Sequence, residues 1–120
     1  MEFLSMSAII YHNPRCTKSR LTLTILEEKG IDFQVIKYLD DTPSAQELKV
    51  LLGELDLDAR SLMRTFEAPY KANNLDDESL SEDDLIQAMV DNPILIERPI
   101  VKTDKGTVIG RPPENVLAII

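Results

Sequence analysis

Cys16 is the residue of this sequence with the clearest capacity for chemistry, because it is the only cysteine and follows a predicted turn. Asn13-Pro14 ends an apolar run, and a helical pattern begins at Thr17. The first N–H groups of a helix have no internal acceptor and stabilise a negative charge. A thiol placed there ionises readily, and the thiolate is the nucleophilic form. We therefore predict that Cys16 is a reactive thiolate.

The neighbours of Cys16 restrict what this thiolate could do. Positive charge is added by three nearby side chains, Arg15, Lys18 and Arg20, whereas an inert buried cysteine has apolar neighbours. Ser19 stands where a dithiol oxidoreductase carries its second cysteine, which excludes self-contained disulfide exchange. Thr22 stands where a cysteine-dependent phosphatase loop carries its arginine, so we do not expect a phosphatase. Any second thiol has to come from another molecule.

The composition indicates a globular protein without an attached metal or nucleic acid. The chain has 120 residues and a net charge of −8, which disfavours binding to a phosphate backbone. One histidine and one cysteine leave no metal-ligand cluster, and we expect no bound cofactor. No apolar run reaches the ~18 residues of a membrane span. A lone cysteine fits a reducing compartment, so we expect a cytoplasmic protein. Residues 1–6 lack the pattern of a signal peptide and are expected to form a disordered extension.

Hydrophobic periodicity predicts the elements that position Cys16. Residues 8–11 and 33–38 are expected to be parallel strands, joined by a helix over 17–29 whose apolar positions include Leu21. Ser44 and Glu47 form a capping-box signature for the next helix, and Asp58 is expected to cap a short one. Residues 66–80 are interpreted as loop, and Ser81 as the start of a further helix.

The remaining residues complete the predicted fold. Residues 100–103 and 107–109 are expected to form an antiparallel hairpin, and residues 112–114 to open a final helix. We therefore predict one α/β domain over residues 1–120. Its mixed sheet has about four strands in the thioredoxin-like order, with a helical insertion after the second strand.

Four motifs, in order along the chain, carry a family resemblance. They are Tyr11-His12-Asn13-Pro14-Arg15-Cys16 with Ser19-Arg20, then Leu62-Met63-Arg64, then residues 92–101 (NPILIERPIV), and Gly110-Arg111-Pro112. Together they closely resemble the glutaredoxin-linked arsenate reductase family, whose fold is thioredoxin-like. The resemblance runs from about residue 8 to the end of the sequence.

The resemblance implies a role for each candidate site residue. Cys16 matches the nucleophile of the family. The three residues that match its oxyanion-binding arginines are Arg64, Arg98 and Arg111. His12 matches a residue that tunes the cysteine, and Ser19 one that can hydrogen-bond its sulfur. Pro99 falls where the fold keeps a cis proline facing the cysteine.

Elementary chemistry agrees with this assignment. An arsenate dianion repels a thiolate, so the two meet only where cations offset the repulsion. Arginine suits this role because its planar fork pairs with a tetrahedral oxyanion through two hydrogen bonds and remains charged. Arginines from separate segments could also stabilise charge on the leaving oxygen.

The reaction that the resemblance implies is the reduction of arsenate to arsenite. The Cys16 thiolate attacks arsenic and displaces an oxygen as water, glutathione adds next, and glutaredoxin supplies the reducing thiol. Thr17-Lys18 departs from the Gly-Thr of the best-known members, which leaves open another oxyanion or a glutathione mixed disulfide as the substrate. A non-enzymatic regulator that binds RNA polymerase, like the Spx branch, is a further alternative, although Ser19 removes the Cys-x-x-Cys switch usual there.

Overall fold

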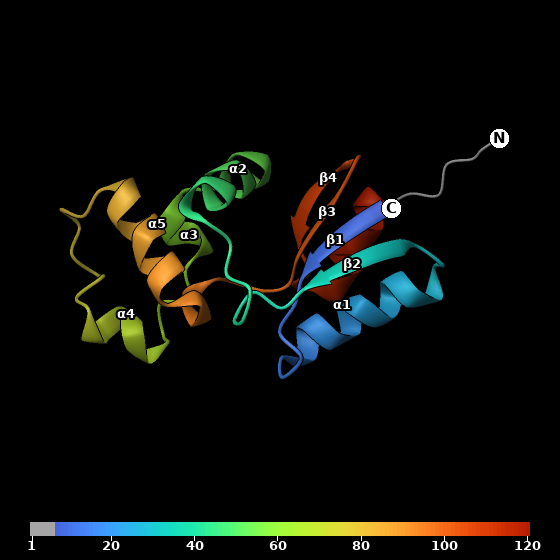
Figure 1. Cartoon of the computed structure of the whole chain (residues 1–120), viewed down its shortest axis with the longest axis horizontal. Coiled ribbons are helices and arrows are strands. Elements are labelled where there is room, and N and C mark those ends of the chain that lie inside the picture. The colour runs from blue at the N-terminus through green and yellow to red at the C-terminus, as the bar shows by residue number, and fades with distance from the viewer. Residues whose placement is uncertain (1–6) are drawn as a thin grey trace. The chain divides into compact units, whose positions relative to one another are not determined.

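The computed structural model describes residues 7–120, and the expectation for residues 1–6 lies outside that range. The described chain forms two compact units (Figure 1). We call residues 7–41 and 98–120 the sheet unit and residues 42–97 the helical unit. The helical unit is therefore inserted into the sequence of the sheet unit, after its second strand.

The sheet unit contains four strands, β1 (Ser7–Tyr11), β2 (Asp32–Ile36), β3 (Ile100–Thr103) and β4 (Gly106–Ile109). Their order in the sheet is β2-β1-β3-β4. Strand β2 is parallel to β1, whereas β3 is antiparallel to both β1 and β4. The predicted four-stranded mixed sheet with its insertion is thus confirmed, and Figure 1 shows β1 and β2 beside one another.

One face of this sheet is covered by α1 (Thr17–Glu28) and the 3₁₀ helix η2 (Pro113–Ile119). Their shared core consists of Ala8, Ile10, Leu26, Val101, Val116 and Ile119. The buried side of α1 agrees with the predicted one only in part. Of the predicted apolar positions Leu21, Ile25 and Leu26, the last is fully buried and Ile25 packs against the core, whereas Leu21 is 48% exposed. Ser19 and Thr22 are fully buried instead. Small side chains occupy that side because the backbone at Gly110 approaches α1 closely there.

Gly110 lies at this close approach, and we predict that Gly110→Ala destabilises the protein. An added Cβ would lie 2.5 Å from Thr22 Oγ1 and 2.8 Å from Cγ of Pro99, so the backbone or α1 must shift. Overpacking of this kind costs about 1–3 kcal/mol, which urea denaturation would measure. Gly53→Ala is the matched control, because its Cβ meets nothing within 4 Å and lies inside a helix. For Gly53→Ala we expect the free energy of unfolding to rise by about 0.5–1 kcal/mol. Equal stability of the two variants would contradict the packing argument.

The helical unit consists of α2 (Ala45–Leu55), α3 (Ala59–Leu62), α4 (Ala68–Ala72), α5 (Glu82–Asp91) and the 3₁₀ helix η1 (Pro93–Leu95). Its buried side chains include Leu48, Leu51, Leu62, Ile86, Met89 and Leu95. The predicted caps are confirmed: Ser44 and Glu47 form a capping box, and the Asp58 carboxylate accepts from Ser61 N at 2.8 Å.

Two local predictions are confirmed and refined. Residues 66–80, predicted as mostly loop, contain one short helix, α4, which has Pro69 in its first turn. Proline is tolerated there because those N–H groups have no helical acceptor. The predicted final helix begins at Pro113 and is a 3₁₀ helix. Thr103 Oγ1 donates to the carbonyl oxygen of Ile119 at 2.7 Å and holds the end of this helix on β3.

Charge is divided unequally between the two units. Residues 7–41 and 98–120 hold nine Lys or Arg and seven Asp or Glu, whereas residues 42–97 hold four and thirteen. The sheet unit is therefore slightly basic, and the acidity of the chain comes from the helical unit. The net charge of −8 does not describe the surroundings of Cys16.

Candidate active site

Cys16 is the N-cap residue of α1, as the sequence predicts. The turn before it is built by main-chain bonds: His12 N donates to Ile36 O at 2.8 Å, and Cys16 N donates to Asn13 O at 3.0 Å. The Asn13 side chain accepts from Arg15 N at 3.0 Å. Cys16 is extended, with φ −93° and ψ 123°, and no side chain caps the helix. The sulfur thus lies beside the first N–H groups of α1.

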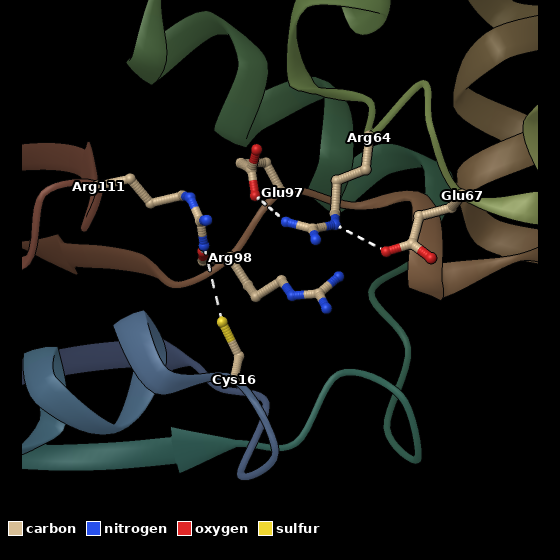
Figure 2. Close-up of polar contacts among 6 residues, drawn as sticks. All are labelled: Cys16, Arg64, Glu67, Glu97, Arg98 and Arg111. Atoms are coloured by element: carbon tan, nitrogen blue, oxygen red, sulfur yellow. Dashed lines mark hydrogen bonds and ion pairs between the residues drawn. The ribbon is translucent and has the colours of Figure 1, made fainter.

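Two arginines that follow in the sequence more than eighty residues later act on this sulfur. Arg111 Nη1 lies 3.6 Å from Cys16 Sγ (Figure 2). The same nitrogen donates to the main-chain oxygen of Arg98 at 3.1 Å, which fixes its position. The Arg98 side chain is only 8% exposed, and its guanidinium lowers the pKa of the thiol. The Arg98–Pro99 bond is cis, as predicted, and so is Arg111–Pro112.

These contacts decide the ionisation of Cys16. Burial by itself raises the pKa of the thiol, because it removes water from the thiolate. The main-chain N–H of Ser19 and the guanidinium groups of the two arginines bond the thiolate and outweigh burial. The pKa of Cys16 is therefore lowered from that of an ordinary thiol.

His12 is joined to this centre through Ser19. His12 Nδ1 lies 2.6 Å from Ser19 Oγ, and Asn13 N donates to the same hydroxyl oxygen at 3.1 Å. Burial, followed by the nearby cations Lys37 and Arg20, lowers the pKa of His12. This arrangement suits a neutral imidazole whose Nδ1 accepts the hydroxyl proton.

Ser19 therefore contacts the sulfur differently from the sequence-based expectation. Its main-chain N–H bonds the thiol, while its hydroxyl is used by His12 and by Asn13 N. We predict that Ser19→Ala lowers the free energy of unfolding by about 1–3 kcal/mol, because two buried polar groups lose their partner. The pKa of the thiol is expected to remain low, since the N–H is retained.

Urea denaturation and the pH profile of Cys16 alkylation would measure these two effects. Ser79→Ala is the control, because that exposed hydroxyl donates to Asp77 at 2.7 Å in contact with water. A Ser19→Ala protein with the alkylation profile of a free thiol would show that the hydroxyl, and not the N–H, stabilises the thiolate.

Arg64 lies in the helical unit and is held by two carboxylates. Its Nε is 3.0 Å from Glu67 Oε2, and its Nη1 is 2.7 Å from Glu97 Oε1 (Figure 2). The guanidinium also lies over the ring of Phe66, with its carbon 4.5 Å from the centroid. Burial lowers the pKa of Arg64, but the two carboxylates outweigh it and raise the pKa. Arg64 is thus fixed within its own unit, and its role toward an oxyanion stays a prediction.

The sheet unit brings together five of the six predicted site residues, all except Arg64. Arg20, which the sequence suggests only as added charge, holds the turn before Cys16. Its Nη1 donates to Pro14 O at 2.9 Å, and its Nη2 donates to Thr17 Oγ1 at 3.2 Å. The pairing of Ser19 with Arg20 in one motif is the signal that could have indicated this role.

Residues 7–120 offer neither a metal site nor a membrane-spanning helix. That part of the chain contains no group of three His, Cys, Asp or Glu side chains close enough to hold a metal ion. None of its helices is both long and apolar enough to cross a membrane. The polar constellation around Cys16 is accordingly the candidate active site.

Comparisons with known proteins agree with this geometry. The model of the ArsC family matches residues 11–119. The arsenate reductase of Haemophilus influenzae is 47% identical over 116 residues, which cover 96% of this chain and all of that protein. The uncharacterised Escherichia coli protein YfgD is 55% identical over 112 residues, or 92% of this chain and 94% of YfgD. The structure of the arsenate reductase of Vibrio cholerae has a TM-score of 0.94 and 52% identity, covering 98% of this chain and 100% of that one. The chain therefore belongs to the ArsC family, within the thioredoxin-like fold.

Proposed function

We propose that this protein reduces arsenate to arsenite, with Cys16 as the nucleophile. The observation that carries the proposal is the Cys16 sulfur at the start of α1, bonded by the Arg111 guanidinium and with its pKa lowered by Arg98 and Arg111. Membership of the ArsC family and the named arsenate reductases among its relatives support the same activity.

The first step follows from the charges at the site. The thiolate attacks arsenic, an As–S bond forms, and one arsenate oxygen takes up protons and leaves as water. The two guanidinium groups reduce the repulsion between thiolate and oxyanion and stabilise the charge that develops on the departing oxygen. The product of this step is a Cys16–As(V) adduct.

The second part of the reaction needs a thiol from outside the chain, because Cys16 is the only cysteine. We propose glutathione as the thiol that adds to arsenic, and glutaredoxin as the protein that removes it. The thiol of glutaredoxin attacks the arsenic-bound sulfur of glutathione, so the two thiols are oxidised to one mixed disulfide and arsenic gains two electrons. Water then attacks arsenic and breaks the As–S bond to Cys16, and arsenite leaves. The Cys16 thiolate is regenerated without a resident cofactor. These reductants, and a cytoplasmic location, are expectations from the sequence.

A steady-state assay with glutathione and glutaredoxin tests the proposal. Arsenate is expected to be converted to arsenite, with one disulfide formed for each arsenite. Phosphate, which has the same shape and charge but is not reduced by thiols, is expected to compete without turnover. No arsenite production, combined with rapid reduction of a glutathione mixed disulfide, would overturn arsenate as the substrate and favour the alternative.

A further inference from the structure

A groove in the sheet unit lies beside the turn that carries Cys16. Its volume is about 350 Å³, within the range of small-molecule sites. Residues 12–15, which precede Cys16, form one wall, and Lys37, Leu39 and Asp40 form the other. The two walls follow β1 and β2, so the groove lies at the carboxyl ends of two neighbouring parallel strands. In open α/β sheets this edge is where ligands bind.

The groove is separate from the arginines that contact the sulfur. Arg98 precedes β3 and Arg111 follows β4, and these strands lie on the other side of β1 from β2. The turn of residues 12–16 therefore has the arginine pair toward β3 and the groove toward β2. A molecule in the groove would lie next to Cys16 in the chain without occupying the place of the oxyanion.

The charged side chains that line the groove form no ion pair within the part of the chain that the structure describes. Arg15, Lys37 and Asp40 are exposed, and none of them forms an ion pair with another residue of the described range 7–120. Pro14 and Leu39 supply apolar surface between the charged groups. Such a groove suits a small, extended molecule with two negative groups, one positive group and a short apolar part.

We propose that this groove binds glutathione, the thiol co-substrate of the proposed function, on which this inference rests. Glutathione carries two carboxylates and one ammonium group. Arg15 and Lys37 match the carboxylates, and Asp40 matches the ammonium. The cysteine of the tripeptide lies between its charged ends, and residues 12–15 of the groove lead directly into Cys16, the residue that would hold arsenic.

Binding is tested without turnover, in the Cys16→Ser protein. The probe is S-methylglutathione, which cannot form a disulfide, and the measurement is the change in amide NMR signals on titration. We expect shifts concentrated at residues 13–15 and 37–40. Lys37→Glu in the same background is expected to weaken binding about fivefold, the effect of losing one exposed charge pair.

Lys29→Glu is the matched control, since it makes the same charge change on an exposed lysine at the other end of α1. It is expected to bind the probe like its parent. The inference is overturned if the shifts fall elsewhere, or if Lys37→Glu binds as tightly as Lys29→Glu.

A second measurement separates this inference from the proposed function. In the protein with Cys16, Lys37→Glu is expected to raise the KM for glutathione about fivefold. Because Lys37 also lowers the pKa of His12, the variant expected to raise that KM while the KM for arsenate changes little is Asp40→Asn, which removes the charge that matches the ammonium.

If S-methylglutathione binds at residues 13–15 and 37–40 but the protein does not reduce arsenate, the groove is supported as a glutathione site and the proposed function is refuted. Arsenate reduction with the same glutathione KM in Lys37→Glu and Lys29→Glu would refute the groove alone.

Discussion

Replacing Cys16 by Ser is expected to abolish arsenate reduction, with a loss of about 10⁴-fold or more in kcat/KM. A serine hydroxyl is not ionised at neutral pH, so the arginine pair would face a neutral and much weaker nucleophile. No other cysteine in the sequence can replace it. The steady-state assay with arsenate, glutathione and glutaredoxin measures the loss.

Thr24→Ser is the control for this substitution. Thr24 lies on the exposed side of the same helix, and its hydroxyl donates to Arg20 O at 3.0 Å, a bond that serine retains. Normal activity is expected for this variant. Substantial turnover in Cys16→Ser would contradict the assignment of the nucleophile.

The lowered pKa of Cys16 also gives this prediction a pH dependence. Alkylation of Cys16 by iodoacetamide is expected to reach half of its maximal rate at a lower pH than alkylation of free cysteine. Because the pKa is depressed in the folded state, the unfolded chain binds more protons between the two pKa values. The contribution of Cys16 to stability is present above the unfolded pKa and is lost as pH falls through the folded one. Cys16→Ser is expected to lose this dependence.

Arg98→Lys is expected to lower kcat/KM for arsenate by about 10²–10³-fold, the effect of removing one oriented donor from a developing charge. Lysine retains a positive charge but not the planar fork, and its ammonium cannot bond the thiolate and an oxyanion in the same way. The Arg98 side chain is buried, so solvent would not replace the lost bonds. Arg111→Lys is expected to show a similar loss, because its Nη1 also bonds Arg98 O.

The pH dependence of activity, compared with the pH profile of Cys16 alkylation, separates two explanations for such a loss. If the arginines act only by lowering the pKa of the thiol, activity returns at higher pH in both variants. We expect only part of it to return, since the fork also binds the oxyanion. Lys105→Arg, at the exposed turn between β3 and β4, is the control for exchanging these side chains. Rates equal to those of the unaltered protein in Arg98→Lys would show that Arg98 does not hold the substrate through two hydrogen bonds.

Much of the fold could be predicted from the sequence because the information is local. Ser44 with Glu47, and Asp58 before a short helix, cap helices by bonds that span three residues. The position of Cys16 at the start of α1 followed from the turn signal of Asn13-Pro14 in the same way. Helix α4 was missed because its few turns carry a proline and no long apolar pattern.

The packed side of α1 could be predicted only in part, at Leu26, because the rest depends on residues almost ninety positions away. Periodicity assigns Leu21 to the core, whereas the close approach of Gly110 requires the small Thr22 instead. The role of the Ser19 hydroxyl also depends on the path of the turn, which brings His12 within reach. For the arginines, family resemblance named the residues; in the structure Arg111 bonds the sulfur, and Arg98 helps to lower the pKa of the thiol.

The insertion of the helical unit also separates Cys16, along the sequence, from the two arginines that help to lower the pKa of its thiol. Strand β1 carries the turn to Cys16, but its partner β3 follows only after residues 42–97, as in the pair of Ile10 with Val101. Closing so long a segment is costly for a flexible chain, and prior folding of the inserted helices shortens the distance to be closed. Arg98 precedes β3 and Arg111 follows β4, so their part in lowering the pKa of Cys16 depends on this closure, whereas the N–H of Ser19 belongs to the helix that Cys16 caps. The further fall in the pKa of the thiol is thus a built-in chemical reporter of the step at which β3 joins β1.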